Sequence, residues 1–417
     1  MNVLFVTAYF PPCQRGYGYM KICESVADGL AGRGHSIAVL TSTFRDGEEF
    51  KPYPVHRLLA VDPDWQLPQS AARQFFFGRR SREKMAVRNL KELVAAFRPD
   101  IIFIWHANSL SRRMLQTAEN LPQIKTVYYF ANYYPEQPDE YIAYWSSGSP
   151  PGLAGPAKKI LAKIALKKLA REGKPIALKF EHSISVSDYV RRRLLNQELI
   201  GPDAVVAHNG VDLGIMATAT RKPLLINGAP LKCLIAGRVA PEKGIHTALQ
   251  ALQVLRAQNQ LQPIQLAVIG DGQPEYKRRL KQFTVEHQLQ KFVRFEPPVP
   301  QQEMPGTLMQ YDVLLFPSVW DEPLSCTMLE AMASELLVVG TTTGGSREVL
   351  FHEQTGLVFQ PNNPSELAEQ LARVQKNPEI VGRLGKAGRR RVEEQFNMQR
   401  TVESVERYLL ELVGDRS

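Results

Sequence analysis

Short apolar runs recur along the first part of the chain, separated by loops and by helical patterns. They occupy residues 3–7, 37–41, 101–105 and 126–130. Each run is too short for a buried helix and mostly continuous in its apolar character, which is typical of a strand buried on both faces. A helical pattern over 19–32 joins the first two runs. The pattern therefore predicts a βαβ unit at the start of a parallel sheet.

The second part of the chain repeats this alternation. Apolar runs lie at 231–236, 265–269, 312–316 and 336–340, and helical patterns cover 245–257, 364–376, 378–395 and 398–413. The repetition predicts an α/β protein with two Rossmann-like domains, each built on a parallel sheet. Because residues 218–230 are polar and show no period, we place the linker there. The expected domains are then 1–217 and 231–395, followed by a closing segment at 396–417.

Two stretches of the first part leave alternatives open. Residues 61–80 are expected to be loop-like, because Asp62, Pro63, Asp64 and Pro68 interrupt any period, and a helix is expected from about 79 to 97. Further on, aromatic side chains gather within 18 residues: Tyr128, Tyr129, Phe130, Tyr133, Tyr134, Tyr141, Tyr144 and Trp145. Such rings stack on sugars or pack against an apolar carrier, and they equally fill a core.

Length and composition narrow the class of protein. The chain has 417 residues, of which 44% are hydrophobic, enough for large cores in about two to four domains. No run approaches the roughly 18 apolar residues of a membrane span. The start is expected to be a strand and not a signal peptide. Four cysteines without metal-ligand spacing fit free thiols in a reducing compartment, so we expect a cytoplasmic protein.

The charge balance indicates the kind of partner. The 51 Lys and Arg against 42 Asp and Glu give +9, which suits nucleic acid, an anionic membrane surface or acidic small molecules. We discount nucleic acid because no nucleic-acid-binding motif is present. Residues 157–171 are strongly basic. At helical spacing Lys159, Lys163 and Lys167 form one row, while Ile160, Leu161 and Ile164 form another side that also carries Lys168. Such a helix is either solvated or docks peripherally on the cytoplasmic face of a membrane.

Candidate chemistry gathers around residues 316–333. A predicted strand ends at Pro317, and Ser325, Cys326 and Thr327 can cap a helix that begins there. A strand, a loop and a helix N-terminus form an anion site, because unpaired amides and the helix dipole face outward. Glu322 lies in the loop and Glu330 about one turn inside the helix. Two carboxylates beside a phosphate site suit a sugar nucleotide, whose sugar and ribose hydroxyls they can hold.

A second phosphate-binding pattern follows the strand at 231–236. There Gly237 and Arg238 precede Lys243 and Gly244 at a junction between strand and helix. Arginine can bind a diphosphate in a bidentate manner, and lysine acts as a point charge. This junction is therefore a candidate diphosphate site.

These motifs together resemble the retaining glycosyltransferases of family 4, which have the GT-B fold. Glu322 and Glu330 match the family's Glu-x7-Glu signature, and 237–244 match its Gly-Arg-x4-Lys-Gly. The resemblance extends to Gly344-Gly345 and to Asn209-Gly-Val-Asp, and it covers nearly the whole chain. The family's Glu-Gly-Phe-Gly is here Glu322-Pro-Leu-Ser325, and its first-loop Gly-Gly is here Tyr17-Gly18.

The resemblance implies a role for each candidate residue. Arg238 and Lys243 hold the donor diphosphate, with Gly237 and the amides of Ser325, Cys326 and Thr327. Glu322 holds the transferred sugar and Glu330 the ribose. In the first domain His106, at the end of a strand, contacts the sugar, and Gly18 forms a wall of the site. The two domains face across a cleft, and the last helix crosses back to the first.

The expected function is then a retaining, hexosyltransferase-type glycosyltransferase. It would move a sugar from a nucleotide-diphosphate sugar to a glycan or lipid-linked acceptor, as in polysaccharide biosynthesis. No cofactor and no metal are expected, because the two cations carry the diphosphate. Two other classes stay open: a sugar-nucleotide epimerase or hydrolase on the same fold, and a non-catalytic nucleotide-sugar-binding protein. The Glu296-Pro297-Pro298 run, where the family usually has glycine, leaves the base unreadable.

Overall fold

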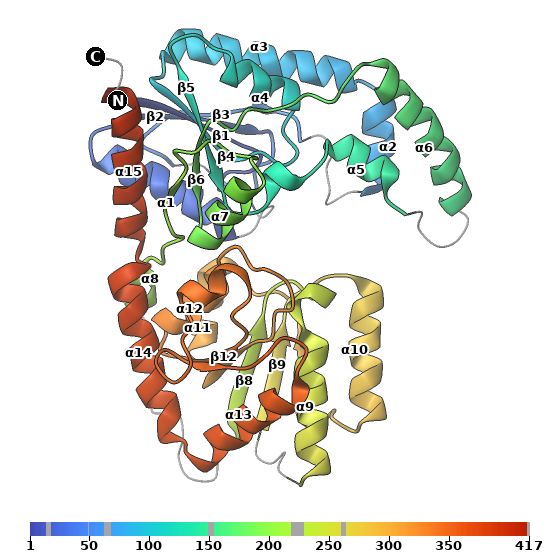
Figure 1. The fold of residues 1–417 in the computed structure, drawn as a ribbon, viewed down its shortest axis with the longest axis vertical. Coiled ribbons are helices and arrows are strands. Elements are labelled where there is room, and N and C mark those ends of the chain that lie inside the picture. The colour runs from blue at the N-terminus through green and yellow to red at the C-terminus, as the bar shows by residue number, and fades with distance from the viewer. Residues whose placement is uncertain are drawn as a thin grey trace. The chain divides into compact units, whose positions relative to one another are not determined.

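The protein, seen in a computed structural model, is made of two compact units (Figure 1). The structure describes residues 1–13, 18–48, 50–61, 68–148, 154–217, 229–259 and 264–414. The first unit contains Met1–Ala207 and Val402–Ser417, and the second contains His208–Thr401. Residues 218–228 of the predicted linker lie outside the described residues. Residues 208–217 fall in the second unit, where Val211 pairs with Asn397.

A seven-stranded parallel sheet forms the centre of the first unit, in the order β3-β2-β1-β4-β5-β6-β7. The strands are β1 (Asn2–Thr7), β2 (Ser36–Ser42), β3 (Val55–Leu59), β4 (Ile101–His106), β5 (Lys125–Phe130), β6 (His182–Ser185) and β7 (Val205–Val206). The strand order reverses between β1 and β4. In open α/β sheets ligands bind at such a switch point, beyond the carboxyl ends of the strands.

Among the described residues of the first unit, seven helices and one 3-10 turn precede β7. They are α1 (Gly18–Gly32), α2 (Pro68–Phe76), α3 (Arg79–Phe97), α4 (Arg112–Glu119), η1 (Tyr134–Glu136), α5 (Glu140–Ser146), α6 (Ala154–Arg171) and α7 (Asp188–Asn196). The prediction of loop for the whole of 61–80 was wrong, because 68–76 are helical. Phe75 is buried against Tyr141 and Trp145, and this tertiary contact favours the helix despite the turn-forming residues before it.

The aromatic residues of 128–145 belong to the packing of this unit. All of them except Tyr144 are buried. Trp105 stacks on Tyr129 with ring centroids 3.9 Å apart, and the Tyr129 hydroxyl donates to the carbonyl oxygen of Ala207 at 2.8 Å. Of the two alternatives for these rings, core packing therefore accounts for seven of the eight.

A six-stranded parallel sheet forms the centre of the second unit, in the order β10-β9-β8-β11-β12-β13. The strands are β8 (Leu231–Ala236), β9 (Ile264–Ile269), β10 (Val293–Glu296), β11 (Val313–Phe316), β12 (Leu337–Gly340) and β13 (Leu357–Val358). Here the order reverses between β8 and β11. The two strands that lead into the predicted phosphate-binding motifs are therefore neighbours at the switch point.

The helices of the second unit are α8 (Leu213–Ala217), α9 (Ile245–Ala257), α10 (Pro274–Glu286), α11 (Met304–Leu308), α12 (Cys326–Ala333), α13 (Pro364–Lys376) and α14 (Glu379–Gln395), with 3-10 turns η2 (Pro241–Lys243), η3 (Gln301–Glu303) and η4 (Gly344–Glu348). The closing helix α15 (Met398–Gly414) has residues in both units. Its part beyond residue 401 packs in the first unit, where Glu406 pairs with Arg33 at 2.9 Å and with His35 at 2.7 Å. This return to the first unit was predicted. In the described part of the chain no helix is both long and apolar enough to cross a bilayer.

Candidate functional site

The loops that follow β8 and β11 lie against each other at the carboxyl edge of the second sheet. Val313 of β11 is in register with Cys233 of β8, so both loops leave the sheet side by side. Gly244 has φ +64°, and a Cβ there would lie 1.8 Å from the carbonyl oxygen of Pro317. The Val319 amide donates to the Glu242 carbonyl oxygen at 3.0 Å. Backbone contact of this kind holds the two predicted motifs in one fixed arrangement.

Lys243 and Glu322 are brought together by this contact between the loops. The Lys243 Nζ lies 2.6 Å from Glu322 Oε1, and the Ser318 hydroxyl donates to the same oxygen at 2.7 Å. The Glu322 side chain is 5% exposed and that of Lys243 is 24% exposed. Because a buried carboxylate is costly unless it is paired, Lys243 and Ser318 stabilise the charge of Glu322.

Ser318 was missed as a site residue by the sequence prediction, which assigned it only to the end of the strand. The sequence feature that could have indicated Ser318 is its position four residues before Glu322 in the same loop. The Ser318 hydroxyl also lies 3.2 Å from the Glu242 carbonyl oxygen. It therefore connects the Glu322 carboxylate to the loop that carries Lys243.

Arg238 is held more loosely than Lys243. Its guanidinium pairs with Glu242 at 3.0 Å, and its side chain is 44% exposed. An exposed ion pair of this kind contributes about 0–1 kcal/mol. The guanidinium is therefore available to an incoming anion at small cost.

The N-terminus of α12 follows the loop that carries Glu322, and so lies beside the Lys243–Glu322 pair. The Ser325 hydroxyl accepts the Met328 amide at 3.3 Å and caps the helix. The first amides of a helix have no acceptor inside it, so those of Cys326 and Thr327 are suited to an anion. Burial raises the pKa of the Cys326 thiol to about 12, so the thiol is neutral at pH 7.

Glu330 lies one turn into α12. Gln301 Nε2 donates to its carboxylate at 3.0 Å. Loss of solvent around the carboxylate raises the pKa of Glu330 to about 7, although the hydrogen bond from Gln301 opposes this shift. Gln301 was not predicted as a site residue, because only the folded chain brings η3 beside α12.

The two glycines after β12, Gly344 and Gly345, contact the backbone of Glu322. The Gly345 amide donates to the Glu322 carbonyl oxygen at 2.7 Å. Gly344 has φ +58°, and a Cβ there would lie 2.2 Å from that same oxygen. The double glycine therefore allows the backbone of the Glu322 loop to approach closely.

The candidate residues of the first unit lie at the switch point of its own sheet. His106 ends β4 in register with Thr7 of β1, and Gly18 begins α1 in the connection after β1. Tyr17 and the side chain of His106 lie outside the described residues. The structure thus places Gly18 and His106 at one sheet edge, and the remaining candidates at the edge of the other sheet.

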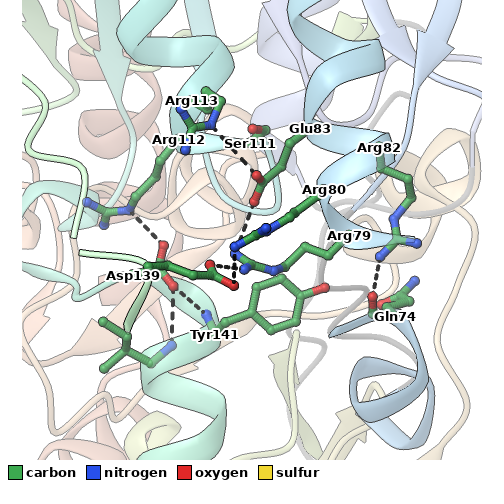
Figure 2. Close-up of polar contacts among 12 residues, drawn as sticks. Gln74, Arg79, Arg80, Arg82, Glu83, Ser111, Arg112, Arg113, Asp139 and Tyr141 are labelled. Atoms are coloured by element: carbon green, nitrogen blue, oxygen red, sulfur yellow. Dashed lines mark hydrogen bonds and ion pairs between the residues drawn. The ribbon is translucent and has the colours of Figure 1, made fainter. Parts of the chain in front are cut away.

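A cluster of arginines lines a small cavity at the same edge of the first unit (Figure 2). Arg79 pairs with Glu83 at 3.1 Å and with Glu172. Arg112 donates to the Gln137 carbonyl oxygen at 2.8 Å and lies 4.0 Å from Asp139. These guanidiniums already have acidic or carbonyl partners, so the cluster joins helices instead of forming an anion site. Among the described residues, no group of three or more His, Cys, Asp and Glu is arranged to hold a metal ion.

Comparisons with known proteins agree with this geometry. The chain matches the family model "Glycosyltransferase Family 4" over residues 21–214 and "Glycosyl transferases group 1" over residues 216–391. It is 27% identical over 244 residues to the putative glycosyltransferase YtcC of Bacillus subtilis, covering 54% of this chain and 59% of YtcC. The chain spans about half the length of the curated relatives it matches.

Solved structures share the whole fold. Sucrose-phosphate synthase from Thermosynechococcus elongatus superposes with a TM-score of 0.70 at 18% identity, over 99% of both chains. Anabaena HepE, solved in complex with UDP-glucose, gives a TM-score of 0.64 at 17% identity over 100% of both chains. The two parallel sheets with their switch points are thus those of the GT-B fold, and the chain belongs to the glycosyltransferases of family 4.

Proposed function

We propose that this chain is a retaining glycosyltransferase that moves a hexosyl group from a nucleotide-diphosphate sugar to a glycan or lipid-linked acceptor. The observation that carries the proposal is the Lys243–Glu322 pair, held by Ser318 beside the N-terminus of α12. One edge thus offers cations and amides for a diphosphate together with a carboxylate for the sugar. The related fold of HepE, solved with UDP-glucose, supports a donor of this class.

The diphosphate of the donor replaces the acidic partners that now hold the two cations. Lys243 turns from Glu322, and Arg238 from Glu242, toward the phosphate oxygens. The amides of Cys326 and Thr327 and the Gly237 backbone complete this diphosphate-binding site, called the cradle below. Negative charge grows on the leaving phosphate in the transition state, so these groups stabilise the transition state more than the bound donor. No metal is needed for this charge stabilisation.

The two carboxylates serve different parts of the donor. Glu322, released from Lys243, accepts hydrogen bonds from sugar hydroxyls and stabilises positive charge at the anomeric carbon. Glu330 accepts the ribose hydroxyls, one helical turn further along. His106 approaches the transferred sugar from the first unit, and Gly18 leaves room for it.

The transfer step conserves the configuration of the sugar. The bond between the anomeric carbon and the diphosphate oxygen breaks, and a bond from the acceptor oxygen to the same carbon forms on the same face. The departing phosphate takes the acceptor proton, so the products are the glycoside and the free nucleoside diphosphate. We place this reaction in the cytoplasm, at the inner face of a membrane when the acceptor is lipid-linked.

A donor screen followed by product analysis tests the proposal. A nucleotide sugar that binds the native state raises the midpoint of thermal unfolding, which identifies the donor. With this donor and an acceptor, NMR of the product is expected to show the donor's anomeric configuration, with the rate unchanged by EDTA. Inversion, or a rate abolished by EDTA, would contradict the corresponding part of the proposal.

Incubation with the donor alone separates the other two classes. A hydrolase releases free sugar without acceptor, and an epimerase yields an isomeric sugar. A binding protein shows the thermal shift but no turnover with any acceptor. Slow release of sugar that a suitable acceptor suppresses is the result expected of a transferase.

A further inference from the structure

Helices α2, α5 and α6 form a small helical lobe on the first unit, with a hydrophobic cluster of their own. Its buried members are Phe75, Tyr141, Trp145 and Ala165. The Phe75 ring lies 5.1 Å from that of Tyr141 and 5.5 Å from that of Trp145. Figure 1 shows the three helices grouped beyond one end of α3, with α6 in green at the rim of the unit. The lobe is thus a separate projection from the sheet.

The face of α6 that packs into the lobe is centred on Ala165, and the side of Ile160, Leu161 and Ile164 points away from it. Ala165 is buried in the lobe, and Ala162, Leu166 and Leu169 pack around it. Lys168 also turns inward, with its ammonium 5.6 Å from the Phe75 ring centroid. Small and medium apolar residues at this spacing are sufficient to attach the helix.

The side formed by Ile160, Leu161 and Ile164 is left in contact with solvent. Ile160 is 63% exposed, Ile164 is 53% exposed and Leu161 is 36% exposed. At 3.6 residues per turn, Ile160 and Ile164 lie on the face of the helix opposite Ala162 and Leu169. Scattered exposed apolar residues need no explanation, but two isoleucines one turn apart form a stripe.

Lysines border this apolar stripe. Lys159, Lys163 and Lys167 are exposed, and no acidic partner is recorded for them in the part of the chain that the structure describes. Helix α6 carries six basic residues and no acidic one. This distribution contrasts with the start of α3, where Arg79 and Arg80, labelled in Figure 2, lie. Both pair with Glu172, which comes just after α6. Arg79 and Arg80 thus have an acidic partner, whereas none is recorded for the three exposed lysines in the described part of the chain.

We propose that this face of α6 docks on an anionic lipid bilayer. Ile160, Leu161 and Ile164 enter the boundary between headgroups and acyl chains, and the bordering lysines contact acidic headgroups. Charge favours this occupant over a second copy of the chain, because a two-fold pairing of the same face would place lysine against lysine. The pairs from Arg79 and Arg80 to Glu172 hold the end of α6 on α3, so the helix is presented already folded.

Vesicle sedimentation without any sugar nucleotide tests the proposal independently of catalysis. We expect binding to phosphatidylcholine vesicles that contain phosphatidylglycerol and much weaker binding to phosphatidylcholine alone. Raising the salt from about 0.1 M to about 1 M shortens the Debye length from about 10 Å to about 3 Å and should release most of the protein. Equal binding to both vesicles, or none to either, would overturn the proposal.

Two sets of variants identify the face. K159E/K163E/K167E and the control K281E/K291E/K376E both lower the formal net charge from +9 to +3, because each exchange removes two charges. A surface lysine raises the affinity for an acidic leaflet about fivefold. The affinity of the first variant for anionic vesicles should therefore fall at least about a hundredfold, and that of the control should change little. Equal losses would mean that net charge alone governs binding.

The apolar part is tested with I160S/I164S against I215S/V285S, which changes exposed apolar residues of the second unit. The first variant should lose vesicle binding and the second should keep it, with unchanged thermal unfolding in both. Analytical ultracentrifugation without lipid checks the other occupant. If the wild type forms a dimer and I160S/I164S does not, the face binds a second copy of the chain and the membrane proposal is overturned. If a variant does not fold, the lipid and salt dependence of vesicle binding by the wild type still tests whether the protein docks on an anionic bilayer.

Discussion

The carboxyl edges of the two sheets are built in different ways. In the second unit the loops from β8 to α9 and from β11 to α12 touch through backbone atoms, as at Gly244 and Pro317. In the first unit the connection after β5 contains η1 and two whole helices, α5 and α6. The diphosphate is the same in every nucleotide-diphosphate sugar, so a rigid phosphate-binding site suits the proposed donor. Acceptors differ, and the edge that would meet them carries inserted elements.

The largest expected effect tests whether the second edge does the chemistry. Arg238→Ala or Lys243→Ala should lower kcat/KM by about two to three orders of magnitude, through loss of roughly 3–4 kcal/mol of transition-state stabilisation. Steady-state kinetics measure this, with Lys281→Ala as a control for an exposed cation of the same unit. Near-normal turnover in both variants would remove the proposed mechanism.

The next prediction separates the two carboxylates within that edge. Glu322→Gln should lower kcat with little change in donor KM, because its contact with the sugar strengthens as charge develops. Glu330→Gln should mainly raise donor KM, by about 5- to 150-fold, since a poorly paired hydroxyl costs about 1–3 kcal/mol. Kinetics on both variants decide. The reverse pattern would mean that the sugar and ribose ends of the donor are assigned backwards.

A pair of glycine substitutions tests the rigidity of the cradle. Gly344→Ala should destabilise the fold by about 1–3 kcal/mol, because the left-handed backbone and the contact with the Glu322 carbonyl oxygen both exclude a Cβ. Gly382→Ala, in α14 where the added Cβ would meet no atom within 4 Å apart from its own helix backbone and chain neighbours, should stabilise it by about 0.5–1 kcal/mol. Denaturant unfolding measures both. Equal shifts would show that close approach at Gly344 is unimportant.

The smallest expected effect is a pH dependence at Glu330. Its pKa is raised to about 7 in the native state from an ordinary value near 4.5. The native state therefore binds more protons than the unfolded state between these values, and stability falls as the pH rises through this window. Glu330→Gln should raise the melting temperature more at pH 8 than at pH 5. Calorimetry at both pH values checks this, and identical shifts would contradict it.

Donor binding should depend on the same titration of Glu330, but it should be favoured by the ionised carboxylate, whereas stability is favoured by the protonated one. Below pH 7 the protonated Glu330 is a poorer acceptor for ribose hydroxyls, so donor KM should rise as the pH falls from 8 to 6. The glutamine variant should lack this part of the profile.

The strands, and the loops after β8 and β11 that carry the candidate motifs, could be predicted because their signals are local. An apolar run such as 101–105 specifies a buried strand without reference to the rest of the chain. Helices α2 and α5 were not predicted, because Phe75 and Trp145 favour helix only by packing on each other. The apolar side with Ile160 was predicted, but its role stayed open between a solvated helix and a docking helix, because periodicity cannot tell which side meets a partner.

Hydrogen-bond partners of the candidate site needed the folded chain. Ser318 and Gln301 are ordinary polar residues in the sequence, and only the loop geometry aims them at Glu322 and Glu330. Residue types at the site were thus predictable, and their connections were not.

Sharing α15 between the two units has a consequence for biosynthesis. The turn after α1, which carries Arg33 and His35, receives Glu406 from the far end of the sequence. On the ribosome, every residue of the second unit is made before Glu406 is, so the second unit can finish folding first even though its residues follow 1–207. The usual order of N-terminal before C-terminal domains is then reversed at the last step. A released chain that ends at Thr401 should have a protease-resistant second unit and a first unit whose α1 is still open to cleavage.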